Sequence, residues 1–541
     1  MKYNKEVKRK INNKGMNGIT LIALVITIIV LLILAGISIS MLSGDNGILQ
    51  RAAEAKEKTE DAQREEEMQL EELAELVKNN GQETGWSVRK HVNAPKVSSG
   101  MIPVKYSNGK WVICSQDDSE WYSYDDKQWA NVMLCDGKYN TTTAVGTEVA
   151  VDDLGSMFVW IPRFAYKITS NYHSNTTGGI DVKFLKGTSS ETDDNVTIVE
   201  YNETTTSNYT QFPDGYVVHP AFTNDVSKGG WSTQLTGIWV AKFEAGYPMA
   251  DTEDDVTSKT SDNMYYPVFK GKRYSYNNYK IQMLYSMCES MTSSRNPYSI
   301  TSSSNSHMIK NSEWGAVAYL TRSSYGKESE IYINNVSFEN DRKNINNSSV
   351  YGLTGYSADA VSRGTNNVSG KDIGDLITGA SYISYVWYDT TNGINASTTG
   401  NITGIYDMSG GCWEYPGGVI PSGHSNINTN GGTTFSTLTA STNKITLYPV
   451  GNSTSSETDI SRSYSSFGSM YGDAIWETSS QVGANFSWNG DRSDEDTYTH
   501  EPFFLRGDRW NAGGQAGSFA FADNHGTAYY TYSTRAVLAV Q

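Results

Sequence analysis

The residue types that usually carry catalysis show no recognised arrangement in this chain. Residues 142–541 contain no Walker loop, no Gly-x-Gly-x-x-Gly after a strand, no His-Glu-x-x-His, no Gly-x-Ser-x-Gly and no Cys-x-x-Cys. The histidines lack metal-ligand spacing, so we expect each to lie at the surface or to be satisfied in the core. They are His91, His173, His219, His307, His424, His500 and His525. The sequence therefore predicts no catalytic residue, no metal ligand and no enzyme.

Four cysteines allow at most two disulfides, which is too few for a cysteine-stapled scaffold. Cys114 and Cys135 are expected on neighbouring strands and could pair outside the cell, although sequence alone leaves the connectivity open. Cys288 is expected as a small hydrophobe on the buried face of a helix. Burial of the 13 Trp and 15 Phe side chains must then supply most of the stability.

The carboxyl-terminal segment 506–535 concentrates side chains suited to binding. Tyr, Ser, Gly and Asn are typical of binding loops, since tyrosine gives a large rigid contact at little entropic cost. We predict that an unknown protein or glycan ligand is contacted by Asp508, Arg509, Asn511, Asp523, Asn524, His525, Thr527, Tyr529, Tyr530 and Tyr532.

Alternation of residue types predicts strands within segment 506–535. Phe519 and Phe521 alternate with small residues, as expected for a strand with one buried face. Alternation would also place Tyr530 and Tyr532 on one face and Tyr529 on the other. The alternative is a tyrosine-rich strand pair packed in the core.

Length and charge bound the class of protein. At 541 residues the chain is long enough for about three domains. Its net charge of −16 argues against nucleic acid and against binding of anionic lipid through its surface. The 49 Gly and 35 Tyr favour strands, turns and exposed loops, which are typical of an extracellular β-rich protein.

The amino terminus differs from the rest. Residues 1–18 are basic, and residues 19–42 form an uncharged run of 24 residues, enough to cross a bilayer core of about 30 Å as a helix. A secretory signal would have a shorter apolar region and a small-residue cleavage site. Residues 48–79 predict a second, amphipathic helix that ends before Gly81. An uncleaved single-span anchor is the simplest interpretation.

The junction Gly18-Ile19-Thr20-Leu21-Ile22 resembles the processing site of type IV prepilins. The resemblance implies that a prepilin peptidase cuts after Gly18 and methylates Ile19; Gly15 is a second candidate cut site. Ala23 stands where the family has a glutamate, which would offset a neighbouring subunit's amine in a filament. Its absence favours a minor or tip subunit over a major pilin.

Residues 81–141 are predicted to form a small β-rich module. Its clearest signal is a hairpin in which segments 102–106 and 111–114 flank the turn 107–109, where Asn-Gly favours the positive φ angles of a tight turn.

Two helices are predicted in the longer remainder of the chain, over residues 279–291 and 311–322. Stretches 341–375 and 421–460, rich in Ser, Asn, Gly and Thr, predict long loops.

Several ordered segments resemble the formylglycine-generating-enzyme variant of the C-type-lectin-like fold. Residues 404–415, GIYDMSGGCWEY, are similar to the motif G-L-Y-D-M-x-G-N-V-W-E-W. LRGDRW at 505–510 and STRAVL at 533–538 resemble the closing R-G-G-x-W and G-F-R-P pair. Weaker matches lie at 157–162, 237–244 and 311–318.

The resemblances together predict an α+β fold: a long amino-terminal pilin-like helix, a small β module and an irregular mixed α/β C-type-lectin-like carboxyl-terminal domain. The predicted parts are a basic leader (1–18), a hydrophobic then amphipathic pilin-like helix (19–80), the β-rich module (81–141) and the ligand-binding domain (142–541).

The lectin-like resemblance also assigns roles to single residues. Trp413 and Trp510 are expected in the core, and Arg506 and Arg535 as guanidinium braces that tie irregular loops together. Glu414 would hold calcium in some relatives.

Two departures from the family bear on cofactors and activity. Gly411 replaces the Asn that accompanies that calcium site, so we expect no cofactor, with calcium as the alternative. The enzyme uses two cysteines near its carboxyl-terminal end, whereas no cysteine follows Cys412 here, so oxidase chemistry has no thiolate.

The arrangement is similar to the variable proteins of diversity-generating retroelements, in which a lectin-like scaffold is diversified near its carboxyl terminus. We therefore expect a cell-surface, type IV pilin-like adhesin, made as a membrane precursor anchored through residues 19–42 and then displayed outside the cell with other pilin subunits. The alternatives are a single-span anchored binding protein and a secretion or competence pseudopilin.

Overall fold

The computed structural model describes residues 29, 86–87, 91–201, 211–248, 266–339, 350–369, 386–449, 467–494 and 500–540. The chain divides into two compact units, Met1–Gly81 and Gln82–Gln541. Apart from Ile29, the predicted leader, membrane span and second helix lie outside the described residues. Within the ranges that the structure describes, no helix has the length and apolar character needed to cross a membrane.

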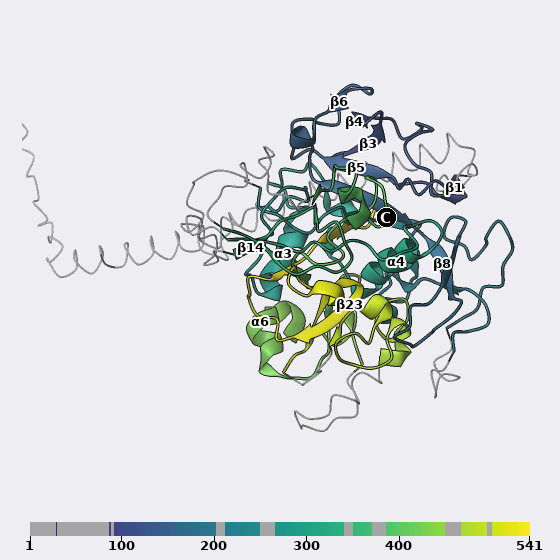
Figure 1. Cartoon of the computed structure of the whole chain (residues 1–541), viewed down its shortest axis with the longest axis vertical. Coiled ribbons are helices and arrows are strands. Elements are labelled where there is room, and N and C mark those ends of the chain that lie inside the picture. Colours follow the sequence, from purple (N-terminus) through teal and green to yellow (C-terminus); the bar gives the residue numbers. More distant parts are fainter. Residues whose placement is uncertain are drawn as a thin grey trace, which may run out of the picture. The chain divides into compact units, whose positions relative to one another are not determined.

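The longest sheet of the second unit has eight strands, and every neighbouring pair is antiparallel. Their order is β12 (His307–Met308), β25 (Ala536–Leu538), β11 (Gly237–Ala241), β7 (Met157–Pro162), β5 (Asn131–Leu134), β3 (Met101–Ser107), β4 (Lys110–Ile113) and β6 (Glu148–Val149). The purple strands of Figure 1 thus share a sheet with one of the last strands of the chain.

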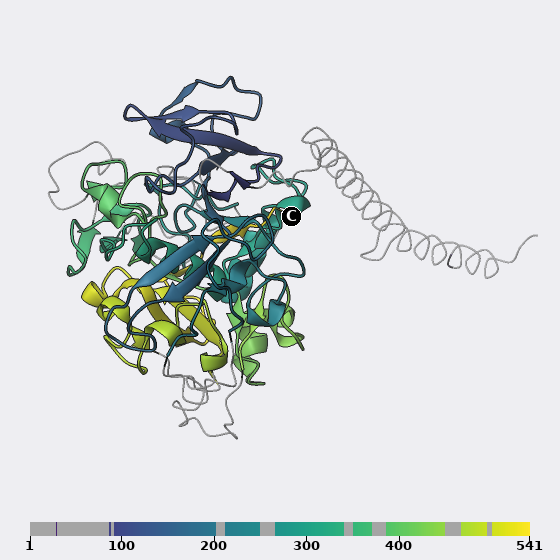
Figure 2. The same cartoon turned by 90° about the vertical axis from the view of Figure 1, so that its right-hand side faces the viewer.

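This sheet crosses the predicted boundary at residue 141. Strands β3, β4 and β5 come from the predicted β-rich module, and β5 pairs directly with β7 of the following region. Figure 2 shows the purple strands lying against the rest of the second unit. Strands β3, β4 and β5 therefore belong to a larger sheet, whose edge on this side is β6.

Local sequence explains the strands at the centre and edge of this sheet. Every residue of β7 and β11 is buried, as expected for strands covered on both faces. Next to the edge strand β6, the predicted hairpin of β3 and β4 is confirmed: Asn108 has φ 52° and Gly109 has φ 79°, the left-handed pair that a tight hairpin turn requires.

A second sheet of seven strands carries the predicted binding segment. Its main path is β20 (Thr446–Leu447), β19 (Gly418–Val419), β22 (Phe503–Gly507), β18 (Trp413–Glu414) and β24 (Tyr532–Ser533). Strand β23 (Gly517–Asn524), yellow in Figure 1, pairs with β22 on one side and with β21 (Ser493–Asp494) on the other.

Strand β23 is buried on both faces over residues 517–522, so the expectation of a single buried face is wrong. Phe519 packs against Trp488 with ring centroids 5.3 Å apart, whereas Phe521 belongs to a separate apolar cluster with Phe504. Alternation cannot reveal such burial, because small residues such as Ala520 are compatible with either environment.

The described residues hold three α-helices. The predicted helices are confirmed as α3 (Ile281–Ser290) and α4 (Asn311–Arg322). The third, α6 (Ser425–Ser436), lies where a loop was predicted and is kinked at Gly432, which has φ 63°. With the many sheets, these helices make a mixed α and β fold.

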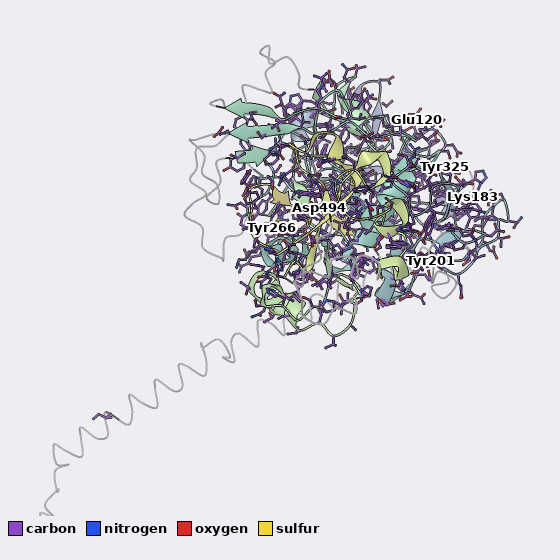
Figure 3. All side chains as sticks on the ribbon, turned by 60° about the horizontal axis from the view of Figure 1, so that its bottom comes forward. Glu120, Lys183, Tyr201, Tyr266, Tyr325 and Asp494 are labelled. Atoms are coloured by element: carbon purple, nitrogen blue, oxygen red, sulfur yellow. The ribbon has the colours of Figure 1, made fainter. Side chains whose placement is uncertain are left out.

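Smaller sheets complete the unit. They are β10 (Val217–Val218), β8 (Phe164–Ile168) and β9 (Ile180–Phe184); β14 (Val350–Gly352), β13 (Val336–Glu339) and β16 (Asn366–Ser369); β15 (Tyr356–Ser357) with β17 (Val386–Trp387); and β1 (Trp86–Ser87) with β2 (Val92–Asn93). Figure 3 shows Tyr325 beside Lys183 of β9, where the Tyr325 ring packs on Phe184 at 4.6 Å.

All four cysteines are free thiols, so the expected pairing of Cys114 with Cys135 is wrong. Cys288 is fully buried on α3, as predicted. Stability therefore rests on packing, and the aromatic side chains account for much of it. Eight Trp rings and one Tyr ring are among the largest fully buried side chains of the described residues, and the ring centroids of Trp160 and Trp239 lie 5.2 Å apart.

Candidate functional site

Arg506, on β22, ties three backbone segments together. Its guanidinium donates to the carbonyls of Asp473 at 2.7 Å, Ala474 at 3.1 Å and Ala520 at 3.1 Å. Burial lowers the pKa of Arg506 to about 10, which still leaves the side chain charged at neutral pH. The predicted role as a brace is confirmed, because one planar group donates to three buried backbone carbonyls.

Arg535 is the second brace, directly before β25. It donates from Nε to Oε2 of Glu414 at 2.7 Å, and a second nitrogen contacts Oε1. It also donates to the carbonyls of Ala241 at 3.2 Å and Asp407 at 3.1 Å. Both carboxylate oxygens of Glu414 are therefore engaged by the guanidinium of Arg535.

The loop after Arg506 is held from inside by Asp508. This residue has φ 57°, and its carboxylate is fully buried. Oδ2 accepts from Nε of Arg492 at 2.7 Å, and Oδ1 accepts from the backbone nitrogen of Arg509 at 2.8 Å. Asp508 therefore shapes the loop and is not at the surface where a ligand would contact it, in contrast to the prediction.

The next three residues divide between surface and interior. Trp510 is buried, as predicted, and its backbone nitrogen donates to the carbonyl of Gly411 at 2.9 Å. Arg509 is half-buried and donates from Nε to Oδ1 of the exposed Asn511 at 2.7 Å. The loop therefore presents one guanidinium and one amide at the surface.

Three tyrosines gather beside this loop. Tyr529 is 41% exposed, and its ring centroid lies 4.3 Å from that of Tyr530 and 5.4 Å from that of Tyr532. Tyr530 in turn lies 6.1 Å from the buried Trp510. We call Arg509, Asn511, Tyr529, Tyr530 and Tyr532 the tyrosine surface.

The predicted alternation of these tyrosines is wrong. The backbone nitrogen of Tyr532 donates to the carbonyl of Tyr529 at 3.1 Å, so residues 529–532 form a turn. Only Tyr532 belongs to a strand, β24. A turn places all three rings together, whereas a strand would have separated them to opposite faces.

Asn524 and Thr527 link the tyrosine surface to the buried Tyr415 through hydrogen bonds. The buried Tyr415 donates through its hydroxyl to the Thr527 carbonyl at 3.0 Å and also to Oδ1 of Asn524. Asn524 then donates from Nδ2 to the Tyr532 hydroxyl at 2.9 Å. Asp523, another residue of the predicted binding set, is half-buried on β23.

The tyrosine surface is uncharged except for Arg509. A side-chain hydrogen bond with Tyr529 is the main cause that raises the pKa of Tyr530, and desolvation adds to it. Burial likewise raises the pKa of Tyr532. Both hydroxyls are therefore protonated at neutral pH and able to donate as well as accept.

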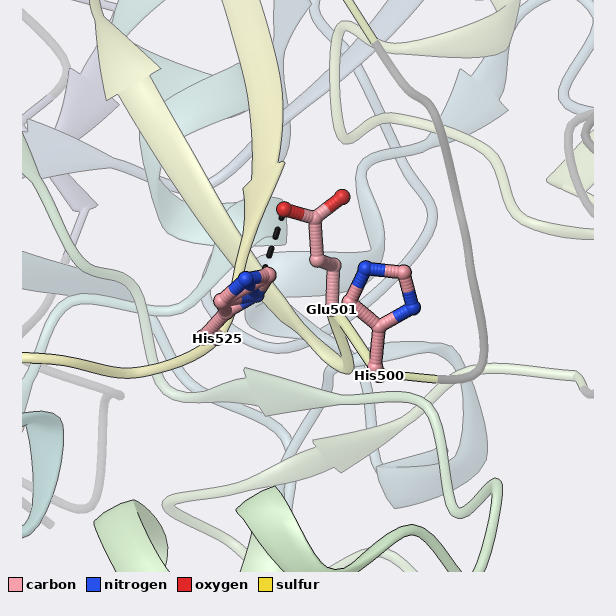
Figure 4. A group of neighbouring side chains, drawn as sticks. All are labelled: His500, Glu501 and His525. Atoms are coloured by element: carbon pink, nitrogen blue, oxygen red, sulfur yellow. Dashed lines mark ion pairs between the residues drawn. The ribbon is translucent and has the colours of Figure 1, made fainter. Parts of the chain in front are cut away.

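A second group of side chains, directly after β23 and before β22, was missed by the sequence analysis. His525 of the predicted binding set lies beside His500 and Glu501, and potential ligand atoms of the three residues lie within 4.8 Å of one another. Nδ1 of His525 is 3.2 Å from Oε1 of Glu501 (Figure 4). No spacing rule reveals this group, because strand pairing alone brings its members together.

The predicted processing residues, Gly18 and Ile19, lie outside the described residues. Comparison with known protein families and with curated proteins found no family model and no protein that matches this chain. Interpretation of its function therefore rests on the sequence resemblances and on the geometry described above.

Proposed function

We propose that this chain is a cell-surface, type IV pilin-like adhesin, a minor or tip subunit that displays a lectin-like binding domain diversified by a retroelement. The observation that carries the proposal is the tyrosine surface: three clustered rings at the end of a segment whose two ends are anchored by the buried Arg506 and Arg535. Anchored ends allow the side chains between them to change without refolding the domain.

The chemistry of the tyrosine surface suits a glycan or a protein loop. Ring faces of Tyr529 and Tyr530 offer apolar area at little entropic cost, and their hydroxyls can donate and accept. Arg509 and Asn511 add hydrogen-bonding groups at the rim. Clustered Tyr and Arg side chains are also the types that most often dominate binding energy.

The amino-terminal part of the proposal rests on the sequence. A basic leader, the junction at Gly18 and the apolar residues 19–42 support processing by a prepilin peptidase and assembly with other pilin subunits. An anchored binding protein or a pseudopilin would keep the same carboxyl-terminal surface. We do not propose an oxidase, because Cys412, the last cysteine, is fully buried and burial raises its pKa well above the usual value.

Replacement of single tyrosines tests the binding surface. Tyr529→Ala and Tyr530→Ala should each weaken binding to a glycan array or to immobilised surface proteins by about 2 kcal/mol, or roughly 30-fold. Tyr139→Ala, which changes a half-buried tyrosine outside the surface, is the matched control and should leave affinity unchanged.

Thermal melts of the same variants separate binding from folding. Because Tyr529 is 41% exposed, its loss should leave the melting temperature close to that of the parent. Parent-like binding by folded Tyr529→Ala and Tyr530→Ala variants would contradict the proposal.

A further inference from the structure

Antiparallel pairing of β22 and β23 brings three metal-ligating side chains to one end of the seven-stranded sheet. Phe503, the first residue of β22, pairs with Asn524, the last residue of β23. His500 and Glu501 lie just before β22, and His525 lies directly after β23. Figure 4 shows the three side chains gathered beside these yellow strands, with the carboxylate of Glu501 facing His525.

Helix α6 holds the backbone of both histidines. Asn426 donates from Nδ2 to the His500 carbonyl at 2.6 Å, and Asn430 donates from Nδ2 to the His525 carbonyl at 2.8 Å. The two asparagines are four residues apart, and therefore lie on the same face of the helix. Residues 500 and 525 are thus fixed by the helix as well as by the strand register.

We propose that His500, Glu501 and His525 bind a divalent transition-metal ion, with zinc the natural test ion. Ligands on a tetrahedral zinc at about 2.0–2.1 Å are separated by about 3.3 Å. Nδ1 of His525 and Oε1 of Glu501 are 3.2 Å apart, yet this contact lacks hydrogen-bond geometry. The remaining ligand atoms, within 4.8 Å, need shifts of at most about 1.5 Å.

His424 lies near the site but is not assigned as a ligand. Its ring centroid is 6.1 Å from that of His500. Nδ1 of His424 caps α6 by accepting from the backbone nitrogen of Asn426 at 3.1 Å, which leaves the ring hydrogen on Nε2. A ring in this state has no lone pair left for a metal.

Three protein ligands would leave at least one coordination position open. The side chain of His525 is 38% exposed and that of Glu501 is 21% exposed, so solvent or an external ligand group reaches the site. Two imidazoles and one carboxylate favour zinc and similar ions over calcium or magnesium, which prefer oxygen ligands. The metal site goes beyond the proposed adhesin function, because its three ligands are not part of the tyrosine surface.

Calorimetric titration of the metal-free full-length chain with zinc chloride, in detergent, tests the proposal. We expect one zinc ion per chain at this site, and at least about tenfold weaker binding after His500→Gln, Glu501→Gln or His525→Gln. His424→Asn, which keeps a residue suited to capping α6, should bind zinc as the parent does. Calcium chloride should give no comparable binding.

Cobalt in place of zinc provides a second readout, because its visible absorption reports coordination by nitrogen and oxygen atoms. Thermal melts of the metal-free variants identify any that fail to fold. Absence of zinc binding by the parent, or equal binding by the parent and all three folded ligand variants, would overturn the proposal. Loss of binding after His424→Asn equal to the loss after His500→Gln would overturn the assignment of these three ligands.

Failure here is distinguishable from failure of the adhesin proposal. The tyrosine variants keep His500, Glu501 and His525, so they should bind zinc even if they lose the glycan or protein ligand. The metal-site variants in turn keep every residue of the tyrosine surface.

Discussion

A single buried carboxylate, that of Glu477, is expected to make the stability of this protein depend on pH. Glu477 is fully buried, and its carboxylate accepts from neutral donors: the Tyr319 hydroxyl at 2.7 Å, the Tyr166 hydroxyl at 2.9 Å and the Gly472 nitrogen at 2.6 Å. Burial raises its pKa to about 7, even though these donors favour the charged form. The folded protein therefore holds the Glu477 proton more tightly than the unfolded chain.

This difference predicts a fall in stability with rising pH. The contribution of Glu477 is fully present below its usual pKa of 4.5 and is lost as the pH rises through about 7. The loss amounts to about 3 kcal/mol at most, since one pKa unit corresponds to about 1.4 kcal/mol. Glu477→Gln cannot ionise, so the stability of the parent relative to this variant should decline between pH 4.5 and 8.

Chemical denaturation of both proteins across this pH range provides the measurement. Glu148→Gln, at an exposed carboxylate, is the control and should differ from the parent by a nearly constant amount. Parallel curves for the parent and Glu477→Gln would contradict a raised pKa at Glu477.

At the scale of elements, some are formed by local turn chemistry and others by tertiary packing. The hairpin of β3 and β4 follows from Asn108 and Gly109, which accept left-handed backbone angles. Helix α6 has no such signal, because it consists largely of Ser, Asn, Thr and Gly. It is held by packing: Phe435 contacts Tyr285 of α3 and Phe503 of β22 at centroid distances of 5.4 and 5.3 Å.

The hairpin turn allows a test of backbone conformation alone. Gly109→Ala should destabilise the protein by about 1–2 kcal/mol, because φ is 79° there and no atom lies within 4 Å of the added methyl group. Gly364→Ala is the matched control: it has equal space but no positive φ, and should change stability by less than about 0.5 kcal/mol. Urea denaturation measures both, and equal effects would show that backbone strain is not the cause.

At the scale of the whole molecule, the two compact units contribute separate parts of the proposed function. The second unit, Gln82–Gln541, joins early strands β3–β6 and late strand β25 in one sheet, so a truncation before Ala536 would remove a strand from between β11 and β12. The first unit contains the residues that resemble a prepilin.

For the first unit, we predict cleavage by a prepilin peptidase after Gly18. Expression with a prepilin peptidase should give a chain that has lost residues 1–18, and Gly18→Arg should block the cut because the family peptidase requires glycine before the scissile bond. Intact-mass spectrometry checks this. Gly15→Arg is the matched control and should be processed normally; loss of residues 1–15 would instead identify Gly15 as the cut site, and a full-length surface form would favour the uncleaved anchor.

Local patterns in the sequence predicted the hairpin at residues 107–109, helices α3 and α4, the buried Cys288 and the bracing roles of Arg506 and Arg535. These features depend on periodicity, turn chemistry and short motifs, all of which operate over a few residues. The mixed α and β character followed from the same signals.

Tertiary structure decided the sites. Asp508 is buried because Arg492 lies against it, and the three tyrosines share one surface because residues 529–532 turn. His500 and His525 meet because β22 and β23 pair in one register, while α6 holds both backbones. Such proximity depends on which distant segments pack together, and the spacing of residues along the chain carries little information about it.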